Sequence, residues 1–158
     1  MMKSTKIITN SHIELWELPN GDLHREDGPA IEYPNGQKEW YLNGNLHRED
    51  GPAIKWIDGY KAWYINGDLH REDGPAIEES EGDKEWWING ERHRKDGPAI
   101  EYFNGDKQWW LNGERHREDG PAIEYYDGNK HWFLNDIEYT EQEYKKKMRL
   151  DKLNKILN

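Results

Sequence analysis

An octapeptide recurs along this chain at one fixed interval. HREDGPAI occurs four times and a variant, HRKDGPAI, once, with histidines at His24, His47, His70, His93 and His116. These histidines are each 23 residues apart, and the columns align without a gap from Leu23 to Asp136. A constant period of this length indicates a repeat architecture, in which each unit packs mainly on its neighbours. The period therefore predicts a repeat protein.

Within one unit the hydrophobic pattern is that of β-strands. The segments AIEY and KEWYL are short runs of β-forming residues bounded by turn residues. Most units place Asn-Gly or Asp-Gly between them, and these pairs favour a two-residue type I′ hairpin turn. The expected turns are Asn35-Gly36, Asp58-Gly59, Glu81-Gly82, Asn104-Gly105 and Asp127-Gly128. The pattern predicts an all-β fold, an elongated antiparallel sheet of tandem 23-residue β-hairpin repeats. This would be an open, solenoid-like meander with a C-terminal α-helix as a cap.

A two-residue turn at Asn35-Gly36 would fix the register of the first hairpin. It would place Ile31 opposite Trp40, and because side chains alternate along a strand, both would share one apolar face. The other face would be acidic and aromatic. We expect that second face to bind a basic partner protein through Tyr41, Tyr64, Trp87, Trp110, Phe133, Glu32, Glu39, Glu78, Glu85, Glu101 and Glu124.

The composition limits both the core and the partners of such an array. Only 34% of the residues are hydrophobic, but nine Trp and nine Tyr supply large groups for a thin aromatic core. The formal net charge of −10 disfavours direct binding to nucleic acid or anionic lipid, both of which attract basic surfaces. The sequence contains no Cys and no apolar stretch long enough for a signal peptide or a membrane span. We therefore expect a soluble, cytoplasmic protein.

The His, Arg and acidic residues of the octapeptide are side chains that catalytic and metal sites also use. Catalysis needs one constellation in a shaped pocket, whereas this set recurs in every unit. Successive histidines should lie about 10 Å apart, too far to share an ion at a ligand distance of about 2.1 Å. We therefore expect no enzyme activity, no metal and no cofactor.

A structural role accounts better for the octapeptide. Asp27-Gly28-Pro29 is a turn signal in which Asp caps backbone N–H groups, Gly permits positive φ and Pro begins a strand. Arg25 can donate a fork of hydrogen bonds to acids of its own unit or the next. Stacked loops would then form an Arg–carboxylate ladder of Arg25, Asp27, Arg48, Asp50, Arg71, Asp73, Arg94, Asp96, Arg117 and Asp119. Lys95 replaces the intervening Glu in one unit, so that acid is dispensable within the chain.

Different segments flank the repeats. Residues 1–22 should form a partial repeat or cap, residues 23–136 five repeats, and residues 137–158 a C-terminal helix. Thr140 and Glu143 have the spacing of a capping box. An apolar stripe formed by Leu150, Leu153, Ile156 and Leu157 should cover the last hairpin. A dimerisation or partner-binding helix is the alternative.

Some residues fit no repeating pattern. His12 and His131 are expected to be solvated or packed. In the third unit, Glu79 and Ser80 stand where other units carry an aromatic residue and its neighbour. This difference indicates either drift at a tolerant position or a local acidic contact site.

The units resemble MORN repeats, and more closely the MORN-variant repeats. The segment NGNLHREDGPAIEYPNGQKEWYLNG is similar to that family in its spacing of NG, H, G, NG and W, over residues 13–136. RED stands where the ordinary MORN pattern has Gly or Lys followed by Gly. The resemblance implies an array of antiparallel hairpins that binds proteins, sometimes binds membranes, or self-associates. It also points to antitoxins and to phage or giant-virus proteins, for which the compartment would be the host cytoplasm.

Three functions remain open at this point. The first is a non-enzymatic scaffold that binds a basic partner protein, for example as an inhibitor or antitoxin that mimics nucleic-acid charge. The second is an array that binds carbohydrate or another small ligand through doublets such as Trp86-Trp87 and Trp109-Trp110. The third is a structural, self-assembling repeat protein. A homodimer through the apolar face or the C-terminal helix is a further alternative.

Overall fold

Each repeat folds into two short hairpins. In the computed structural model, which describes residues 3–157, β3 (Ile31–Glu32) pairs with β4 (Lys38–Glu39). A second hairpin follows directly and joins β5 (Tyr41–Leu42) to β6 (Asn45–Leu46). β4 then pairs with β7 (Ile54–Lys55) of the next repeat, and this pairing joins the two repeats edge to edge. The chain forms two compact units, Met1–Gly90 and Glu91–Asn158.

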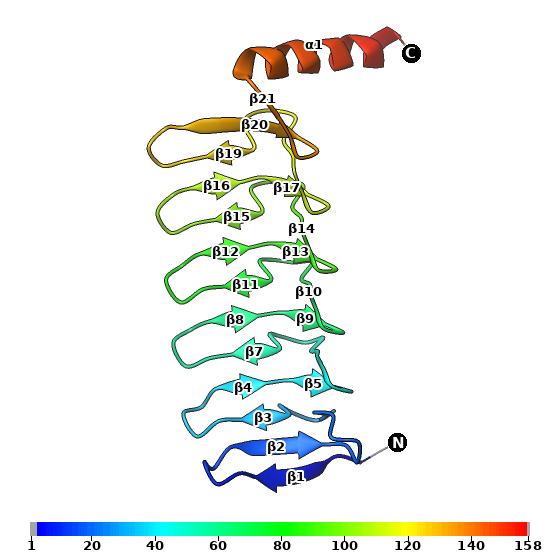
Figure 1. Cartoon of the computed structure of the whole chain (residues 1–158), viewed down its shortest axis with the longest axis vertical. Coiled ribbons are helices and arrows are strands. Elements are labelled where there is room, and N and C mark those ends of the chain that lie inside the picture. The colour runs from blue at the N-terminus through cyan, green and yellow to red at the C-terminus, as the bar shows by residue number, and fades with distance from the viewer. Residues whose placement is uncertain (1–2, 158) are drawn as a thin grey trace. The chain divides into compact units, whose positions relative to one another are not determined.

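The first unit contains an open antiparallel sheet and two small side hairpins. Its remaining strands are β1 (Thr5–Ile8), β2 (Glu14–Glu17), β8 (Lys61–Ala62), β9 (Tyr64–Ile65), β10 (Asp68–Leu69), β11 (Ile77–Glu78), β12 (Lys84–Glu85) and β13 (Trp87–Ile88). The sheet has the order β1-β2-β3-β4-β7-β8-β11-β12 (Figure 1). The side hairpins are β5–β6 and β9–β10. The partial repeat expected before residue 23 supplies β2, and β1 is an added edge strand.

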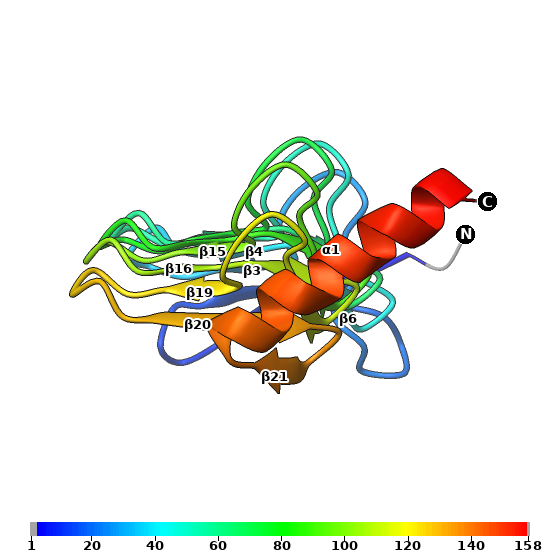
Figure 2. The same cartoon turned by 90° about the horizontal axis from the view of Figure 1, so that it is seen from above.

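The second unit continues the same pattern and ends in a helix. It contains β14 (Glu91–Arg92), β15 (Ile100–Glu101), β16 (Lys107–Gln108), β17 (Trp110–Leu111), β18 (Glu114–Arg115), β19 (Ile123–Glu124), β20 (Lys130–Leu134), β21 (Ile137–Tyr139) and α1 (Glu141–Leu157). Its sheet has the order β15-β16-β19-β20-β21, and β17 pairs with β18. α1 contacts β20 and β21 and crosses that end of the sheet (Figure 2). The predicted fold class, an open antiparallel sheet of tandem hairpin repeats with a C-terminal helix, is confirmed.

The register of the larger hairpin differs by one residue from the expected register. Ile31 lies opposite Glu39, not opposite Trp40. Tyr33 donates its backbone N–H to the carbonyl of Gln37 at 3.0 Å, so three residues form the turn. Of these three, only Gly36 has a positive φ, of 90°. This is a three-residue hairpin loop with glycine in the left-handed region, and the predicted type I′ turn at this site was wrong.

The type I′ geometry belongs instead to the second hairpin. Asn43 and Gly44 have φ values of 50° and 79°, which is the two-residue combination that such a turn requires. Later repeats show the same positive φ at Asn66-Gly67, Asn89-Gly90 and Asn112-Gly113, and at Asn135-Asp136. The sequence pattern did not predict a hairpin in this segment, and the structure shows one there.

The change of register alters which residues share a face. Opposite residues of an antiparallel pair project to the same side, so Ile31 and Glu39 share one face, which we call the Ile face. Glu32 and Lys38 share the other face. Trp40 follows Glu39 and therefore projects to this second side, which we call the Trp face. The expected single apolar face of Ile31 and Trp40 is wrong, because shifting a strand by one residue exchanges its faces.

Alanine forms the most buried layer of the repeats. The alanines of all five octapeptides have no exposed surface, namely Ala30, Ala53, Ala76, Ala99 and Ala122 (0% each). Trp40 donates its backbone N–H to the carbonyl of Ala53 at 2.7 Å, and Trp63 donates to Ala76 at 2.8 Å. The methyl groups of Ala53 and Ala76 therefore lie across from half-buried indoles on the Trp face and leave room for them. The most buried layer is therefore formed by alanine, and not by isoleucine and tryptophan as expected.

The C-terminal helix begins with the capping box that the sequence predicts. Thr140 donates its backbone N–H to the Glu143 carboxylate at 2.9 Å, and Glu143 donates its N–H to the Thr140 hydroxyl at 3.3 Å. Tyr144 is the side chain of α1 that is buried. The expected apolar stripe does not cover the last hairpin, since its members are exposed: Leu150 (49%), Leu153 (49%), Ile156 (71%) and Leu157 (80%). α1 therefore packs through its first turns.

Candidate functional site

The octapeptide loop, His24–Pro29 in the first repeat, is organised around its arginine. Arg25 donates from Nε to Asp27 at 2.8 Å, and from Nη1 to the carbonyl of Pro29 at 3.1 Å and to Glu32 at 3.2 Å. The Nε–Asp bond recurs in every octapeptide, at 2.8 Å for Arg48 and Arg71, 3.4 Å for Arg94 and 2.7 Å for Arg117. The predicted pairing of Arg with Asp is thus confirmed. It closes each loop on itself, with the acceptor in the same repeat.

The arginines lower the pKa of the aspartates with which they pair. Hydrogen bonding and the charge of Arg25 hold the pKa of Asp27 below its ordinary value. Arg48 and Arg71 act in the same way on the pKa of Asp50 and of Asp73. These carboxylates therefore stay ionised to a lower pH than a free aspartate, and the loop surface keeps its negative charge.

A stack of arginine on tryptophan joins successive repeats. The Arg25 guanidinium lies 4.0 Å from the centroid of the Trp16 ring, and Arg48 lies 4.1 Å from that of Trp40. The same contact measures 4.0 Å for Arg71 on Trp63 and 3.8 Å for Arg117 on Trp109. In each pair, the tryptophan belongs to the repeat that precedes the repeat of the arginine. The stack therefore ties neighbours together through a cation–π contact that the sequence analysis did not predict.

The glycine of each octapeptide packs against this guanidinium. A Cβ on Gly28 would lie 2.8 Å from Cζ of Arg25, and one on Gly74 would lie 2.9 Å from Cζ of Arg71. Gly28 does not have a positive φ, in contrast to the expectation from the turn signal. Close approach, not backbone conformation, is the reason for glycine here. The guanidinium therefore contacts both the indole ring of the preceding repeat and the glycine of its own loop.

The motif histidines bind the type I′ turns. Nδ1 of His24 accepts the backbone N–H of Asn43 at 3.1 Å, and His47 accepts that of Asn66 at 3.1 Å. Equivalent bonds join His70 to Asn89, His93 to Asn112 and His116 to Asn135, at 3.2 to 3.3 Å. Histidine thus satisfies a backbone donor of the second hairpin. A constant separation of 19 residues between His and Asn was the signal in the sequence that could have shown this pairing.

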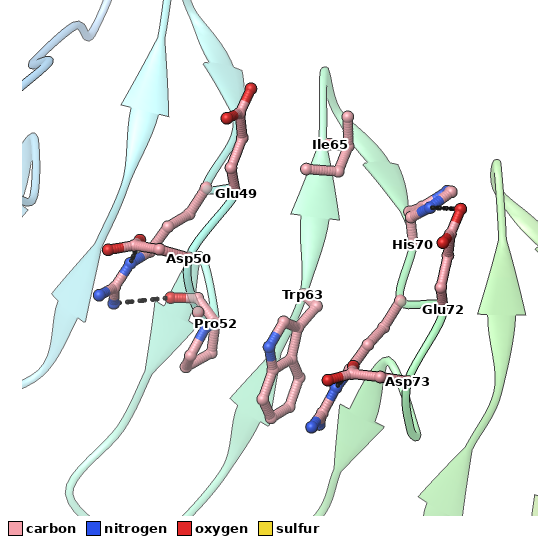
Figure 3. Close-up of a pocket in the computed structure, with 11 residues that line it drawn as sticks. Glu49, Asp50, Pro52, Trp63, Ile65, His70, Glu72 and Asp73 are labelled. Carbon is pink, nitrogen blue, oxygen red and sulfur yellow. Dashed lines mark hydrogen bonds and ion pairs between the residues drawn. The ribbon is translucent and has the colours of Figure 1, made fainter.

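Hollows lie between successive octapeptide loops. The 48–73 hollow has a volume of about 670 Å³ and is lined by Arg48 to Pro52, by Trp63 and Ile65, and by His70 to Asp73. In Figure 3, Asp50 and Asp73 come from the two loops, and Trp63 lies between them. The 25–50 hollow, of about 630 Å³, is its equivalent one repeat earlier, with Trp40 and Leu42 between the loops. Both hollows lie within the first unit.

These two hollows are negatively charged and their acids face solvent. Each is lined by four carboxylates and two guanidinium groups, which leaves a formal charge of −2. Glu49 and Glu72 expose 87% and 86% of their side chains, and the imidazoles of His47 and His70 lie 3.9 Å from them. In the second unit, the 94–119 hollow of about 720 Å³ contains Lys95 in place of a glutamate. That hollow has three cationic side chains and three carboxylates, and is formally neutral.

The last octapeptide loop faces the C-terminal helix in place of another repeat. A terminal hollow of about 820 Å³ is lined by Glu118 and Asp119 on one side and by Lys145 and Arg149 of α1 on the other. Lys155 lies 3.9 Å from Glu118. The Tyr144 hydroxyl donates to the backbone carbonyl of Arg117 at 2.9 Å. Basic side chains of the chain itself therefore lie against this acidic loop.

The structure does not bring the predicted partner-binding residues onto one face. Tyr41 shares the Ile face with Glu39, to which its hydroxyl donates at 3.1 Å. Trp87 donates to Glu85 at 2.9 Å and Trp110 to Gln108 at 3.1 Å in the same way. The carboxylates of Glu32, Glu78, Glu101 and Glu124 lie instead beside the arginines, at 2.8 to 3.2 Å. The prediction that these residues share one face is therefore wrong, because the register of the hairpin differs by one residue from the expected register.

The aromatic members of that predicted set are also not free surfaces. Tyr41, Tyr64, Trp87 and Trp110 are half-buried, and Phe133 is buried with 5% exposure. Burial, followed by the charge of Glu39, raises the pKa of Tyr41. Burial likewise raises the pKa of Tyr60 to about 12. The octapeptide loops, in contrast, carry highly exposed acids such as Glu49 (87%) and Glu72 (86%).

Residues outside the repeating pattern do not assemble into a further site. His12 is exposed and has a φ of 59° in a turn, and His131 contacts Glu138 at 2.7 Å. Burial and the surrounding acids Glu85, Asp83, Asp58 and Glu81 raise the pKa of Glu79 in the third repeat. Among residues 3–157, no cluster of three or more potential ligand side chains could hold a metal ion. Over the same residues, no helix is both long enough and apolar enough to cross a bilayer.

Compared with protein-family models and with curated proteins, the chain matches none of either.

Proposed function

We propose that this chain is a non-enzymatic repeat scaffold that binds a basic partner protein. The contact surface is the row of octapeptide loops on the Trp face, where the arginines hold each loop in shape and the acids point outward. The partner is of the kind expected from the sequence, but we assign its contact to the loops and not to the face that carries Tyr41. The resemblance to MORN-variant repeats fits such a role and stays a prediction.

One observation carries the proposal. The 25–50 and 48–73 hollows each combine a formal charge of −2 with the ring of Trp40 or Trp63. Carboxylates attract a cationic partner over a distance comparable to the Debye length, and an aromatic surface supplies contact area once the partner has arrived. The loops are held by hydrogen bonds and by the Arg–Trp stacks, so little ordering is required on binding.

The alternative of a carbohydrate-binding array has less support. Adjacent side chains of a strand project to opposite faces, so the two indoles of Trp109-Trp110 cannot form one stacking surface. Self-association remains a prediction, for which the exposed Leu150, Leu153 and Leu157 of α1 are the candidate contacts. An inhibitor or antitoxin of a nucleic-acid-binding protein is the most specific form of the proposed scaffold.

We place this activity in the cytoplasm. A chain without cysteine needs no disulfide bonds and suits a reducing compartment.

A polycation titration tests the proposal. Fluorescent poly-lysine should bind the full chain at low salt, and the affinity should fall steeply as salt is added, because ion pairs are screened. The double variant Glu49→Gln/Glu72→Gln should weaken binding about tenfold through loss of two surface charges in the hollows. The control Glu81→Gln/Glu114→Gln removes the same charge from exposed positions outside the hollows and should bind like the parent chain.

Two results would contradict the proposal. Equal losses in both double variants would mean that net charge alone attracts the polycation. Binding that does not respond to salt would exclude the carboxylates as the contact.

A further inference from the structure

The interloop hollows have the chemistry of sites for single lysine or arginine side chains. Such a side chain has a long aliphatic stem and a charged head, and it binds best where apolar surface and carboxylates lie together. In the 48–73 hollow, Trp63 and Ile65 supply the apolar surface, and Glu49, Asp50 and Glu72 are among the acids around it (Figure 3). Asp50 already accepts from Arg48, whereas Glu49 and Glu72 are more than four-fifths exposed.

The second unit shows what occupies the equivalent position when a repeat is missing. In the terminal hollow, Lys145 and Arg149 of α1 lie opposite the acidic loop that carries Glu118 and Asp119. Lys155 approaches Glu118 to 3.9 Å. The chain itself thus places cationic side chains against an octapeptide loop. The inner loops have the same backbone arrangement without a helix above them.

The spacing of the hollows sets the spacing of their occupants. Each repeat adds two strands to the sheet, so successive hollows should lie about 9.6 Å apart. A polyproline II segment rises about 3.1 Å per residue with three residues per turn, which places every third side chain on one side at about 9.3 Å intervals. A β-strand would send the third residue to the opposite side. A polyproline II segment therefore matches the array, and a strand does not.

We propose that the 25–50 and 48–73 hollows bind a basic segment in the polyproline II conformation, with a lysine or arginine at every third position. One cationic side chain enters each hollow. This inference rests on the proposed function and specifies the form of the basic partner. The 94–119 hollow is a weak subsite, because Lys95 leaves it formally neutral.

Peptides of identical composition test the spacing. We would titrate the full chain with dye-labelled KPSKPSKPS and with the clustered isomer KKKPPPSSS and measure fluorescence anisotropy at low salt. The spaced peptide should bind about tenfold more tightly, because one bound lysine raises the effective concentration of the next at its hollow. The affinity of Glu49→Gln/Glu72→Gln for the spaced peptide should fall to that for the clustered one.

The natural variation at Lys95 provides a gain-of-function test. Lys95→Glu gives the 94–119 hollow the charge of the other two, and we expect a second peptide to bind per chain, more weakly because one hollow acts there alone. Glu72→Lys, which copies the natural Lys95, should reduce binding in the first unit. Both positions are exposed, and unchanged far-ultraviolet circular dichroism would verify that the variants fold.

The outcomes separate this inference from the function on which it depends. If both peptides bind equally well and both depend on Glu49 and Glu72, the three-residue spacing is wrong and the acidic scaffold stands. If neither peptide depends on these glutamates, both proposals fail. If the spaced peptide binds preferentially but Lys95→Glu adds no second site, the hollows are not equivalent subsites and the inference is overturned.

Discussion

The two ends of each repeat follow different rules. At the loop end, four of the five octapeptides are identical, and the arginine bonds an aspartate and stacks on the preceding tryptophan. At the other end, the hairpin tip, the two residues before the glycine differ from repeat to repeat. Large side chains are exposed there, such as Ile57 (73%), Phe103 (79%) and Tyr126 (75%). The tip needs little more than a glycine with positive φ, as at Gly36 and Gly59. The repeats of this chain are thus nearly identical in sequence at the end where side chains join neighbouring repeats, and they differ at the other end.

The largest effect should come from removing a loop arginine. Arg71→Ala deletes the stack on Trp63 and the hydrogen bonds to Asp73, Pro75 and Glu78. We expect the free energy of unfolding to fall by about 3 kcal/mol, from one cation–π contact and several charge-assisted bonds. Urea denaturation would measure this. Lys107→Ala, an exposed change near a hairpin tip, should lower it by less than about 0.5 kcal/mol. Similar losses at both sites would remove the distinction between the two ends.

A double-mutant cycle should isolate the glycine contact. A methyl group on Gly74 would meet the Arg71 guanidinium at 2.9 Å, so Gly74→Ala should cost about 2 kcal/mol through overpacking. In the Arg71→Ala background the space is open, and the same change should cost close to nothing. The two substitutions should therefore be strongly non-additive in urea denaturation. Additive losses would show that glycine is required there for its backbone and not for the close approach.

The two turns of a repeat should differ in their need for asparagine. Asn66 has a φ of 52°, and Asn66→Ala should lower the free energy of unfolding by about 1 kcal/mol because alanine tolerates this region poorly. Asp58 in the hairpin tip has no positive φ, and Asp58→Ala removes only the exposed hydrogen bond that its carboxylate accepts from the Tyr60 backbone N–H. This variant should therefore cost about half as much. Thermal denaturation of the two variants would compare them. An equal or larger cost at Asp58 would reverse the turn assignment.

Acid should weaken the loop end first. Hydrogen bonding and the charge of Arg71 hold the folded pKa of Asp73 below its ordinary value of 3.8, so the unfolded chain binds this proton more readily. The stabilisation is therefore complete above the ordinary pKa and is lost as the pH falls toward the folded pKa. The parent chain should lose more stability between about pH 5 and about pH 3 than Arg71→Ala does. Parallel pH profiles of the two would contradict this linkage.

The smallest effect should come from the exposed tip. Ile57→Ser replaces a side chain with 73% exposure and should change the free energy of unfolding by less than about 0.5 kcal/mol. A loss of more than 1 kcal/mol in urea would indicate a buried contact at this end of the repeat.

The sequence predicted the features that depend on local pattern. The 23-residue period, the hairpins, the capping box at Thr140 and the Arg25–Asp27 pair all follow from residues close together in the chain. The register did not follow, because each unit contains two Asn-Gly or similar pairs and only the second is a type I′ turn. Choosing between them requires the contact of Asn43 with His24, which spans 19 residues.

The remaining differences also come from contacts distant in sequence. The Arg48–Trp40 stack joins two repeats and gives glycine a role that its turn signal does not show. The apolar residues of α1 from Leu150 onward match a packing stripe in spacing, yet the helix is anchored by Tyr144 and its bond to Arg117. The sequence does not show which acids are free to form a surface. Glu32 and its equivalents are paired with arginine, which leaves the exposed acids of the octapeptide loops.

Paramagnetic broadening of the indole N–H signals would test most directly whether binding occurs at the loop end. A spin label would be attached to the KPSKPSKPS peptide, and assigned tryptophan signals of the full chain would be compared with and without it. The indoles of Trp40 and Trp63, which line the charged hollows, should broaden most, and Trp109 beside the neutral hollow should broaden less. Preferential broadening of Trp56, at the hairpin tip and 37% exposed, would contradict the assignment of function to the octapeptide loops.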